Sequence, residues 1–173
     1  TASLKGIRVL EMAQIMAGPT CGLLLADLGA EVIKIEKIPG GDDTRNFLPP
    51  EINGESAAFM MMNRNKKGIA LNLKDKDGIE IFKTMVKNSD VVLENFRKGT
   101  LEKLGVGYDV MSEINPKIIL CEISGYGRTG PYADKGGFDL VAQGMSGLMS
   151  ITGESKDKPP MKVGAPITDI TAG

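Results

Sequence analysis

Strand-like and helix-like segments alternate along the chain, and this alternation constrains its fold more than any other feature. IRVLEM at 7–12 reads as a buried strand, and CGLLLADLGA at 21–30 follows as a helix, with Pro19 suited to its first turn. EVIKIEK then supplies a second strand that ends at Glu36. Strands joined in this way predict a parallel sheet with right-handed crossovers. We therefore expect an α/β fold, with a Rossmann-like, doubly wound, mainly parallel sheet and helices on both faces.

The pattern continues through the rest of the chain. Residues 75–90 place Ile79, Phe82, Met85 and Val86 on one helical face, and strands are expected from 90 and from 117. Between them and the first unit lies IPGGDDTRNFLPPEINGES, at 38–56, whose Gly, Pro and Asp content predicts a long surface loop.

Composition limits the class of protein. A chain of 173 residues, 42% hydrophobic and 25% charged, suits one globular core and hence one domain. A net charge of −1 argues against general binding of nucleic acid or membrane surfaces. The sequence has no apolar run of membrane-spanning length and no signal-peptide pattern at its start, so a cytoplasmic location is expected. Cys21 and Cys121 lie far apart and lack metal-site spacing, which favours two reduced, buried thiols.

The chain has no histidine. This removes Ser–His and Cys–His catalysis, histidine metal sites and histidine proton shuttles. Carboxylates, lysines or a cofactor must therefore carry any chemistry.

The first strand–helix–strand unit can be compared with the dinucleotide-binding fingerprint. That fingerprint needs G-x-G-x-x-G at the first turn, so that backbone amides approach the pyrophosphate. The turn here reads MAGPTCG, with a proline where an amide donor would be useful. Nicotinamide or flavin binding is therefore disfavoured.

Three clusters could meet an anionic ligand: NRNKKG at 63–68, ENFRKGTLEKLG at 94–105 and the glycine-rich GYGRTGPYADKGG at 125–137. The second follows a predicted strand, where ligands of open α/β sheets bind. Each could equally be a solvated turn. None has the Walker lysine pattern, so an ATPase is disfavoured.

GAPITDITAG, at 164–173, sets one carboxylate, Asp169, among small and apolar residues. A carboxylate in such surroundings is usually capped, paired or used. Asp is among the best N-cap residues, so Asp169 could cap a helix that begins at Ile170.

Eight segments together carry a resemblance to a known family. They are LKGIRVLEMAQIMAGP, LGAEVIKIEK, GGDDTR, NRNKKGIALNL, VVLENFRKGTLEKLGVGY, ISGYGRTGP, GGFDLVAQGMSGLMSITG and GAPITDITAG. In this order they resemble the N-terminal part of a family III CoA-transferase, over essentially the whole chain. That family includes formyl-CoA, succinyl-CoA:dicarboxylate and carnitine CoA-transferases, and the related methylacyl-CoA racemases.

The resemblance gives Asp169 a second possible role, as the nucleophile that attacks an acyl-CoA thioester. It implies an acyl-aspartyl anhydride and then an aspartyl-CoA thioester, with acyl-CoA and a small carboxylic acid as substrates and no metal. A carboxylate needs no general base to act as a nucleophile, so a chain without histidine can run this chemistry. The nucleophile is the favoured role.

The resemblance also implies residues that contact CoA. Met16 and Ala17 would line the pantetheine path, Lys37, Leu71 and Lys74 would surround the nucleotide, and Asn95, Phe96, Arg97, Lys103, Gly136 and Phe138 would complete the site. Lysine at 37 and 103 stands where formyl-CoA transferases tend to carry arginine, which loses bidentate geometry. Met16 stands where they carry glutamine. Formate and oxalate are therefore disfavoured as substrates.

Two alternatives stay open. Racemases of the family carry a histidine before the aspartate of the GGFDLVAQ motif, and this chain has Phe138 there, which disfavours a 2-methylacyl-CoA racemase. The chain could also be a non-catalytic acyl-CoA-binding or assembly module. Because family members are longer, we expect residues 1–173 to be the N-terminal CoA-binding α/β domain of a two-domain enzyme that forms an interlocked homodimer, and to be inactive alone.

Overall fold

The computed structural model describes residues 2–155 and 157–173, with five parallel strands in one sheet. The strands are β1 (Arg8–Glu11), β2 (Glu31–Glu36), β5 (Lys67–Ala70), β6 (Val91–Glu94) and β7 (Ile119–Glu122). Their order is β5-β2-β1-β6-β7, and every neighbouring pair is parallel. The chain builds the sheet first on one side of β1 and then on the other. This doubly wound arrangement confirms the predicted fold class.

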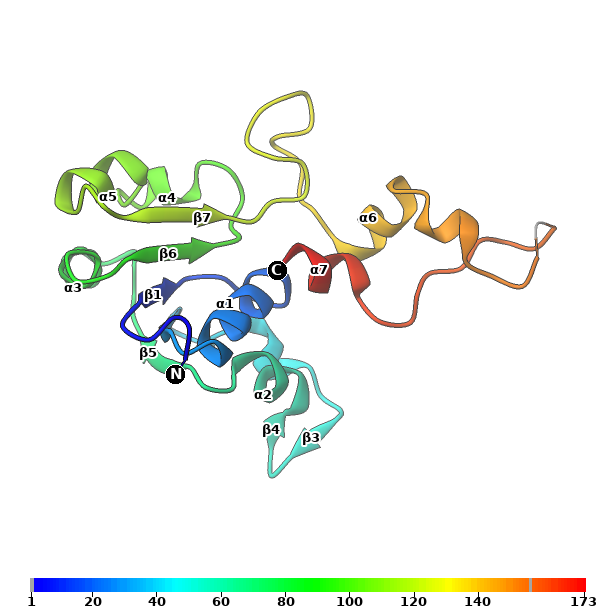
Figure 1. Cartoon of the computed structure of the whole chain (residues 1–173), viewed down its shortest axis with the longest axis horizontal. Coiled ribbons are helices and arrows are strands. Elements are labelled where there is room, and N and C mark those ends of the chain that lie inside the picture. The colour runs from blue at the N-terminus through cyan, green and yellow to red at the C-terminus, as the bar shows by residue number, and fades with distance from the viewer. Residues whose placement is uncertain (1, 156) are drawn as a thin grey trace.

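Helices cover both faces of the sheet (Figure 1). α1 (Ala17–Asp27) packs on one face, and α3 (Lys76–Val86) and α5 (Tyr108–Ile114) pack on the other. The other helices are α2 (Ala57–Asn63), α4 (Thr100–Lys103), α6 (Asp139–Met145) and α7 (Ile167–Ala172). Val9 of β1 and Leu93 of β6 belong to the buried cluster under α1. Leu10 and Val92, the neighbouring residues on the same strands, belong to the cluster packed against α3 and α5. The two cores follow from the alternation of side chains along a strand.

The expected helices and strands form, with shifted ends. α1 begins at Ala17, four residues before the expected segment, so that Pro19 lies in its first turn as predicted. In α3, Phe82 and Val86 are fully buried on the predicted apolar face. The Cys21 and Cys121 thiols are free and half-buried, and burial raises the pKa of Cys21 to about 11.

The segment 38–56 is mostly exposed, as predicted, but it is not simply a loop. It contains the 3₁₀ helix η1 (Asp43–Asn46) and a short antiparallel pair, β3 (Glu51–Ile52) and β4 (Glu55–Ser56). Asp42 and Thr44 are buried, and the Asp42 carboxylate caps η1 by accepting the Thr44 N–H at 2.9 Å. Part of this polar segment therefore belongs to the interior.

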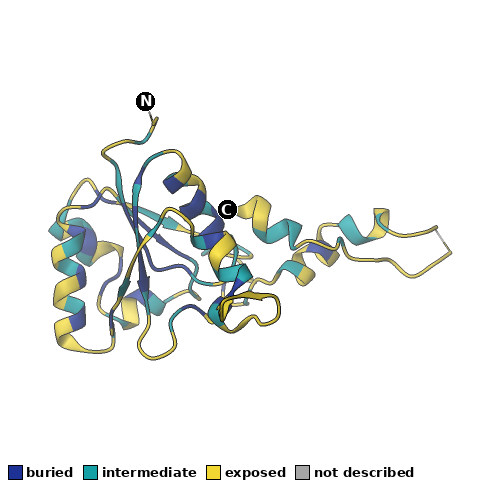
Figure 2. Cartoon of the chain, turned by 90° about the horizontal axis from the view of Figure 1, so that it is seen from below, coloured by how far each residue is buried: buried dark blue, intermediate teal, exposed yellow. Residues whose placement is uncertain are grey.

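After β7 the chain leaves the sheet. We call residues 138–155 and 157–166 the arm; it contains α6 and η2 (Leu148–Ile151) and extends away from the strands (Figure 1). Figure 2 shows most of it as exposed or half-buried, and Ile151 is 83% exposed. The chain then returns, and α7 packs against α1. Among the described residues, no helix has both the length and the apolar character that a membrane span requires.

Candidate active site

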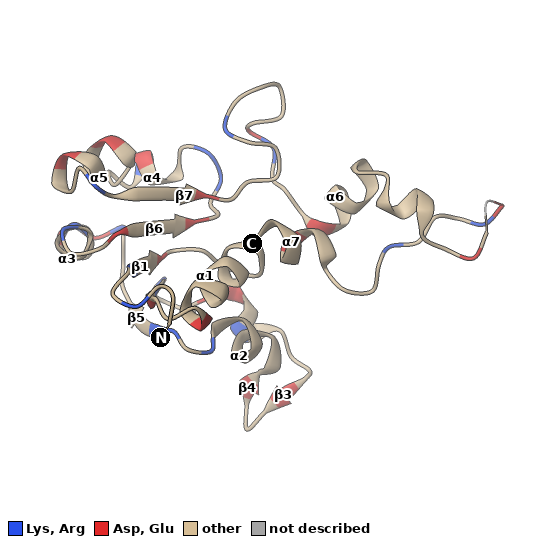
Figure 3. Cartoon of the chain, viewed as in Figure 1, with Lys and Arg blue, Asp and Glu red and all other residues tan. Residues whose placement is uncertain are grey.

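The carboxyl ends of β1 and β6 form the topological switch point of the sheet, because the chain winds to opposite sides from β1. In open α/β folds, ligands bind at this place. The turn from Met12 to Met16 leads from β1 into α1, and Asn95 directly follows β6. Basic and acidic residues are interspersed along the chain (Figure 3). The site is therefore described by its individual contacts rather than by a large surface of one charge.

The turn after β1 is held from two sides. The Asn95 side chain accepts a hydrogen bond from Gln14 N at 2.9 Å and donates one to Gln14 O at 2.8 Å. The next residue, Ile15, has φ of 68°, a left-handed conformation that is strongly disfavoured for a β-branched side chain. Such strain costs about 1–3 kcal/mol, and it persists only where surrounding contacts fix the backbone. Here the Asp42 carboxylate accepts the Ile15 N–H at 3.1 Å.

Four buried charged side chains lie beneath this turn. Lys34 pairs with Glu11 at 3.0 Å and with Asp42 at 2.8 Å, and Lys66 pairs with Glu11 at 2.7 Å. Burial outweighs the attraction of Glu11 and lowers the pKa of Lys66 to about 8. The two lysines and two carboxylates are formally neutral as a set, which is what the interior tolerates.

Asp169 lies on the short helix α7. The prediction that it caps a helix beginning at Ile170 is wrong, because α7 begins at Ile167 and contains Asp169. The hydrogen bond to the start of α7 comes from elsewhere: the Asp139 carboxylate accepts Thr168 N at 3.0 Å and Thr168 Oγ1 at 2.6 Å. Asp169 is half-buried, and burial, together with the nearby negative charge of Asp139, raises the pKa of its carboxyl.

α7 sits over the beginning of α1. A Cβ on Gly173, at the end of α7, would lie 2.4 Å from Ala17 O and 2.8 Å from Thr20 Cβ. Met16 and Ala17, at the start of α1, are both half-buried. The helix that carries Asp169 and the turn held by Asn95 therefore meet at the N-terminus of α1.

A shallow hollow of about 360 Å³ opens at the carboxyl end of β2. It is lined by Glu36, Lys37, Ile38, Pro39, Gly40, Gly41, Arg45 and Ala70. Lys37 is exposed and pairs with Asp43 across this region. Leu71 follows the hollow in sequence, but its side chain is only 7% exposed and belongs to the core. Lys74 is exposed.

Three of the predicted CoA contacts lie together. A Cβ on Gly136 would lie 3.4 Å from the Phe138 ring and 3.6 Å from Arg97 Nη2. Phe138 is 62% exposed, and Arg97 is also exposed. Phe96 is separated from them, because its side chain packs against the cluster that contains α3 and α5.

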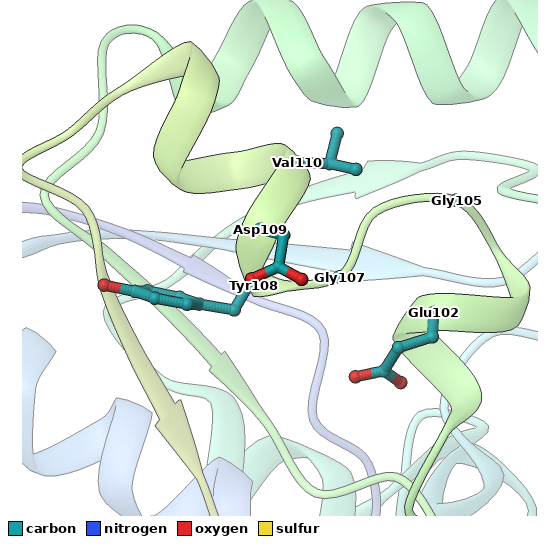
Figure 4. A pocket seen from close by; sticks show the side chains of 6 residues that line it. All are labelled: Glu102, Gly105, Gly107, Tyr108, Asp109 and Val110. Atoms are coloured by element: carbon teal, nitrogen blue, oxygen red, sulfur yellow. The ribbon is translucent and has the colours of Figure 1, made fainter.

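Lys103 lies on α4 and does not line the second small hollow, of about 270 Å³, that its neighbour Glu102 lines (Figure 4). The lining residues are Glu102, Gly105, Gly107, Tyr108, Asp109 and Val110. Two carboxylates and no cation line this hollow, so it is a poor place for a phosphate.

The lysines and arginines of the cluster at 63–68 are all paired. Arg64 pairs with Asp27 at 2.6 Å, Lys66 with Glu11, and Lys67 with Glu31 at 2.6 Å. This segment therefore stabilises the fold rather than offering free cations to a ligand.

Sequence reasoning missed an ion cluster at the ends of β6 and β7. The Arg128 guanidinium contacts the fully buried Glu94 and lies 3.0 Å from Glu122. Burial and, to a smaller extent, Glu122 raise the pKa of Glu94 to about 7, against the opposing effects of a hydrogen bond from Phe96 N and of Arg128. The signal was present, since both strands end in glutamate.

Comparison with known proteins agrees with this architecture. The family model described as CoA-transferase family III matches residues 4–173. The chain is 47% identical to a succinate–glutarate CoA-transferase of Agrobacterium fabrum over 98% of its length, and 46% identical to a succinyl-CoA:glutarate CoA-transferase of Mus musculus, also over 98%. It spans only 44% and 39% of those two relatives.

A solved structure is similar over the same region. A crystal structure of a CAIB/BAIF family protein from Brucella suis superimposes with a TM-score of 0.91 at 45% identity, covering 96% of this chain and 45% of that one. Because the family model matches nearly every residue, the chain belongs to CoA-transferase family III.

Proposed function

We propose that residues 1–173 form the N-terminal CoA-binding domain of an enzyme that moves CoA from an acyl-CoA to a carboxylic acid. The match of the family model over residues 4–173 supports this. The names of the two relatives pair succinate or succinyl-CoA with glutarate. We therefore infer succinyl-CoA as donor and a short dicarboxylate as acceptor.

Asp169 is the proposed nucleophile. Its carboxylate oxygen attacks the thioester carbonyl, CoA leaves as a thiolate, and an acyl-aspartyl anhydride forms. The thiolate then attacks the Asp169 carbonyl of the anhydride, which releases the donor acid and leaves an aspartyl-CoA thioester. The acceptor carboxylate attacks this thioester and forms a second anhydride, from which the returning thiolate takes the acceptor acyl group. Asp169 is regenerated, and the carboxylates and thiolate balance without a general base.

The observation that carries this proposal is the environment of Asp169. Burial and Asp139 raise the pKa of its carboxyl, so its carboxylate is more basic and more nucleophilic than an exposed aspartate. The Asp139 carboxylate caps α7 by accepting the Thr168 N–H, so Asp169 is not needed as the helix cap.

The proposed path of CoA runs along the carboxyl edge of the sheet. Lys37 in the hollow beside β2, with Lys74, Arg97 and Lys103, supplies positive charge for the phosphates. Met16 and Ala17 line the pantetheine path toward Asp169. The remaining proposed contacts are Leu71, Asn95, Phe96, Gly136 and Phe138. Since the Leu71 side chain is in the core, its contact would come from the backbone.

The test is Asp169→Asn in the complete gene product. The amide keeps the shape but is a very poor nucleophile, so transfer from succinyl-CoA should fall at least about 10³-fold while CoA binding and folding are retained. In the wild type, incubation with acyl-CoA followed by hydroxylamine or borohydride should modify Asp169.

The matched control is Asp77→Asn, an exposed aspartate at the start of α3, which should transfer normally. Near-normal turnover of the Asp169 variant, with no adduct on the wild type, would refute the nucleophile. If the wild-type gene product itself transferred no CoA, a non-catalytic acyl-CoA-binding or assembly module would be the better description.

The complete protein is proposed to be an interlocked, cytoplasmic homodimer whose transfer chemistry uses no metal. Apolar side chains of α6 are exposed: Leu140 is 55% and Met145 60% exposed. Their exposure supports the proposal that another part of the dimer covers the arm. Residues 1–173 alone should not turn over, because water must be excluded from an anhydride. Analytical ultracentrifugation of the complete product tests the oligomeric state.

A racemase is the weaker alternative. It would need a base beside Phe138, and Asp139 is the one carboxylate adjacent in sequence. Although burial raises the pKa of Asp139, hydrogen bonds from Thr168 and Gln143 outweigh it, so its pKa lies below the usual value. A carboxylate held in this way is a poor proton acceptor.

A further inference from the structure

Asp42 is a buried carboxylate to which the proposed reaction gives no role. Its side chain is fully buried, in a segment whose composition predicted exposure. The backbone around it is anchored: Asp42 N donates to Glu36 Oε2 at 3.0 Å, and Arg45 binds both oxygens of Glu36 at 2.7 Å. Glu36, the last residue of β2, therefore fixes the position of the Asp42 backbone.

The Asp42 carboxylate joins three separate parts of the chain. It pairs with Lys34 of β2, accepts from Thr44 N and Oγ1 of η1, and accepts from Ile15 N in the turn after β1. Burial raises its pKa, but Lys34 and the hydrogen bonds from Thr44 outweigh this and hold the pKa below its usual value. The group therefore stays ionised at neutral pH.

Ile15 is the contact that concerns function. Its left-handed backbone places a β-branched residue where glycine or asparagine would be favoured. The carbonyl and amide of the preceding Gln14 are already held by Asn95. Asp42 fixes the next peptide by accepting the Ile15 N–H. Met16 and Ala17 follow directly in the chain.

We propose that Asp42 is a positioning residue: by binding Ile15 N it fixes the left-handed turn and so sets where Met16 and Ala17 meet the acyl-CoA. This inference rests on the proposed function, because it assumes that these two residues line the CoA path. Asp42 itself touches no substrate.

Asp42→Asn removes the negative charge and one of the two oxygen acceptors of the side chain. The buried Lys34 ammonium requires the single amide oxygen, so the NH₂ group faces the N–H groups of Ile15 and Thr44, which cannot accept a hydrogen bond. The turn loses its hold on one side. In the complete gene product, KM for succinyl-CoA should rise about tenfold, while kcat changes less than about threefold.

The control is Thr44→Val, because Thr44 is fully buried and donates to the same Asp42 carboxylate. It removes the Oγ1 donor at 2.8 Å but leaves the bond to Ile15. Its melting temperature should fall, and its KM should stay at the wild-type value. If Thr44→Val raises KM as much as Asp42→Asn does, Asp42 acts through general stability and the proposal is wrong.

Ile15→Asn supplies a rescue, because asparagine adopts the left-handed conformation readily. Added to Asp42→Asn, it should return KM most of the way to the value of the Ile15→Asn single variant. An unchanged, high KM in the double variant would overturn the proposal.

Hydrogen exchange of the Ile15 amide gives a measurement that needs no variant. In the wild type without CoA this amide should already be protected, because the turn is held before ligand binds. Rapid exchange that slows only on adding CoA would contradict the proposal. Failure of the proposed function gives a different result: the wild type itself would not transfer CoA, whatever the exchange of Ile15.

Discussion

At the scale of single residues, the carboxyl edge of the sheet holds carboxylates in three different states. Asp42 is ionised and paired, Asp169 has its pKa raised by burial and by Asp139, and Glu94 has its pKa raised to about 7 beside Arg128. The difference comes from partners: Asp42 has a lysine and several N–H and O–H donors, whereas Glu94 shares one arginine with Glu122.

Glu94 should make stability depend on pH. Its folded pKa lies above the unfolded value of 4.5, so the folded state binds more protons between about pH 4.5 and 7, and the free energy of unfolding should fall as pH rises through that window. Glu94→Gln removes the titration and should flatten the slope. Urea denaturation at several pH values measures this.

A second variant checks the cause. Glu122 contributes to the raised pKa of Glu94, so Glu122→Gln should move the pH-dependent fall to lower pH without abolishing it. A wild-type slope that survives in Glu94→Gln would mean that another group titrates there.

At the scale of elements, the central contact is that of α1 with the sheet. Added Cβ atoms would lie 2.2 Å from Ala13 Cβ at Gly18 and 1.8 Å from Glu11 Oε2 at Gly22. The two glycines are one helical turn apart, so one edge of α1 lies directly on β1 and its turn. The closeness of this contact lets Lys66 reach both Glu11 and the carbonyl of Pro19, at 2.8 Å.

Gly22→Ala should therefore be strongly destabilising, by about 2–4 kcal/mol, despite the higher helix propensity of alanine. The new methyl would displace Glu11, whose oxygens are held by Lys34 and Lys66. Thermal or urea denaturation measures the loss.

Gly144→Ala in α6 is the matched control, because its added Cβ meets only Met149 Sδ at 3.6 Å. It should be neutral or slightly stabilising. Equal losses in the two variants would show that the contact with Glu11 does not set the cost.

The elements also show what the sequence could predict. Apolar runs predicted β1 and β2, and the spacing of Phe82 and Val86 predicted the buried face of α3. The burial of Asp42 was missed because its neighbours are glycines and polar residues. A physical signal existed in Lys34, which lies among the apolar residues of β2: a buried ammonium needs a carboxylate, and the sequence could not say which one.

At the scale of the whole molecule, the proposed site is assembled from parts of the chain that lie far apart in sequence. Arg97, Gly136 and Phe138 lie close together in the structure, whereas their contact with CoA and the path from them to Asp169 stay predictions. No local pattern could define that path, because it depends on how the arm and α7 return to α1.

The complete gene product should not exchange the proton next to the thioester of a 2-methylacyl-CoA, since Phe138 cannot carry a proton. Incubation in heavy water followed by mass spectrometry measures the exchange, and succinyl-CoA transfer by the same preparation is the control for activity. Rapid deuterium incorporation that is lost in Asp139→Asn would overturn the transferase proposal.

The two holds on the turn after β1 also bear on the order of folding. Gln14 is bound by a residue 81 positions later, and Ile15 by one 27 positions later. Contacts across such separations form late, because the intervening chain must first be ordered. During synthesis the turn leaves the ribosome early, yet it can adopt its strained conformation only after β2, η1 and β6 are in place. A nascent chain that ends before Asn95 would carry the residues of the turn without its shape.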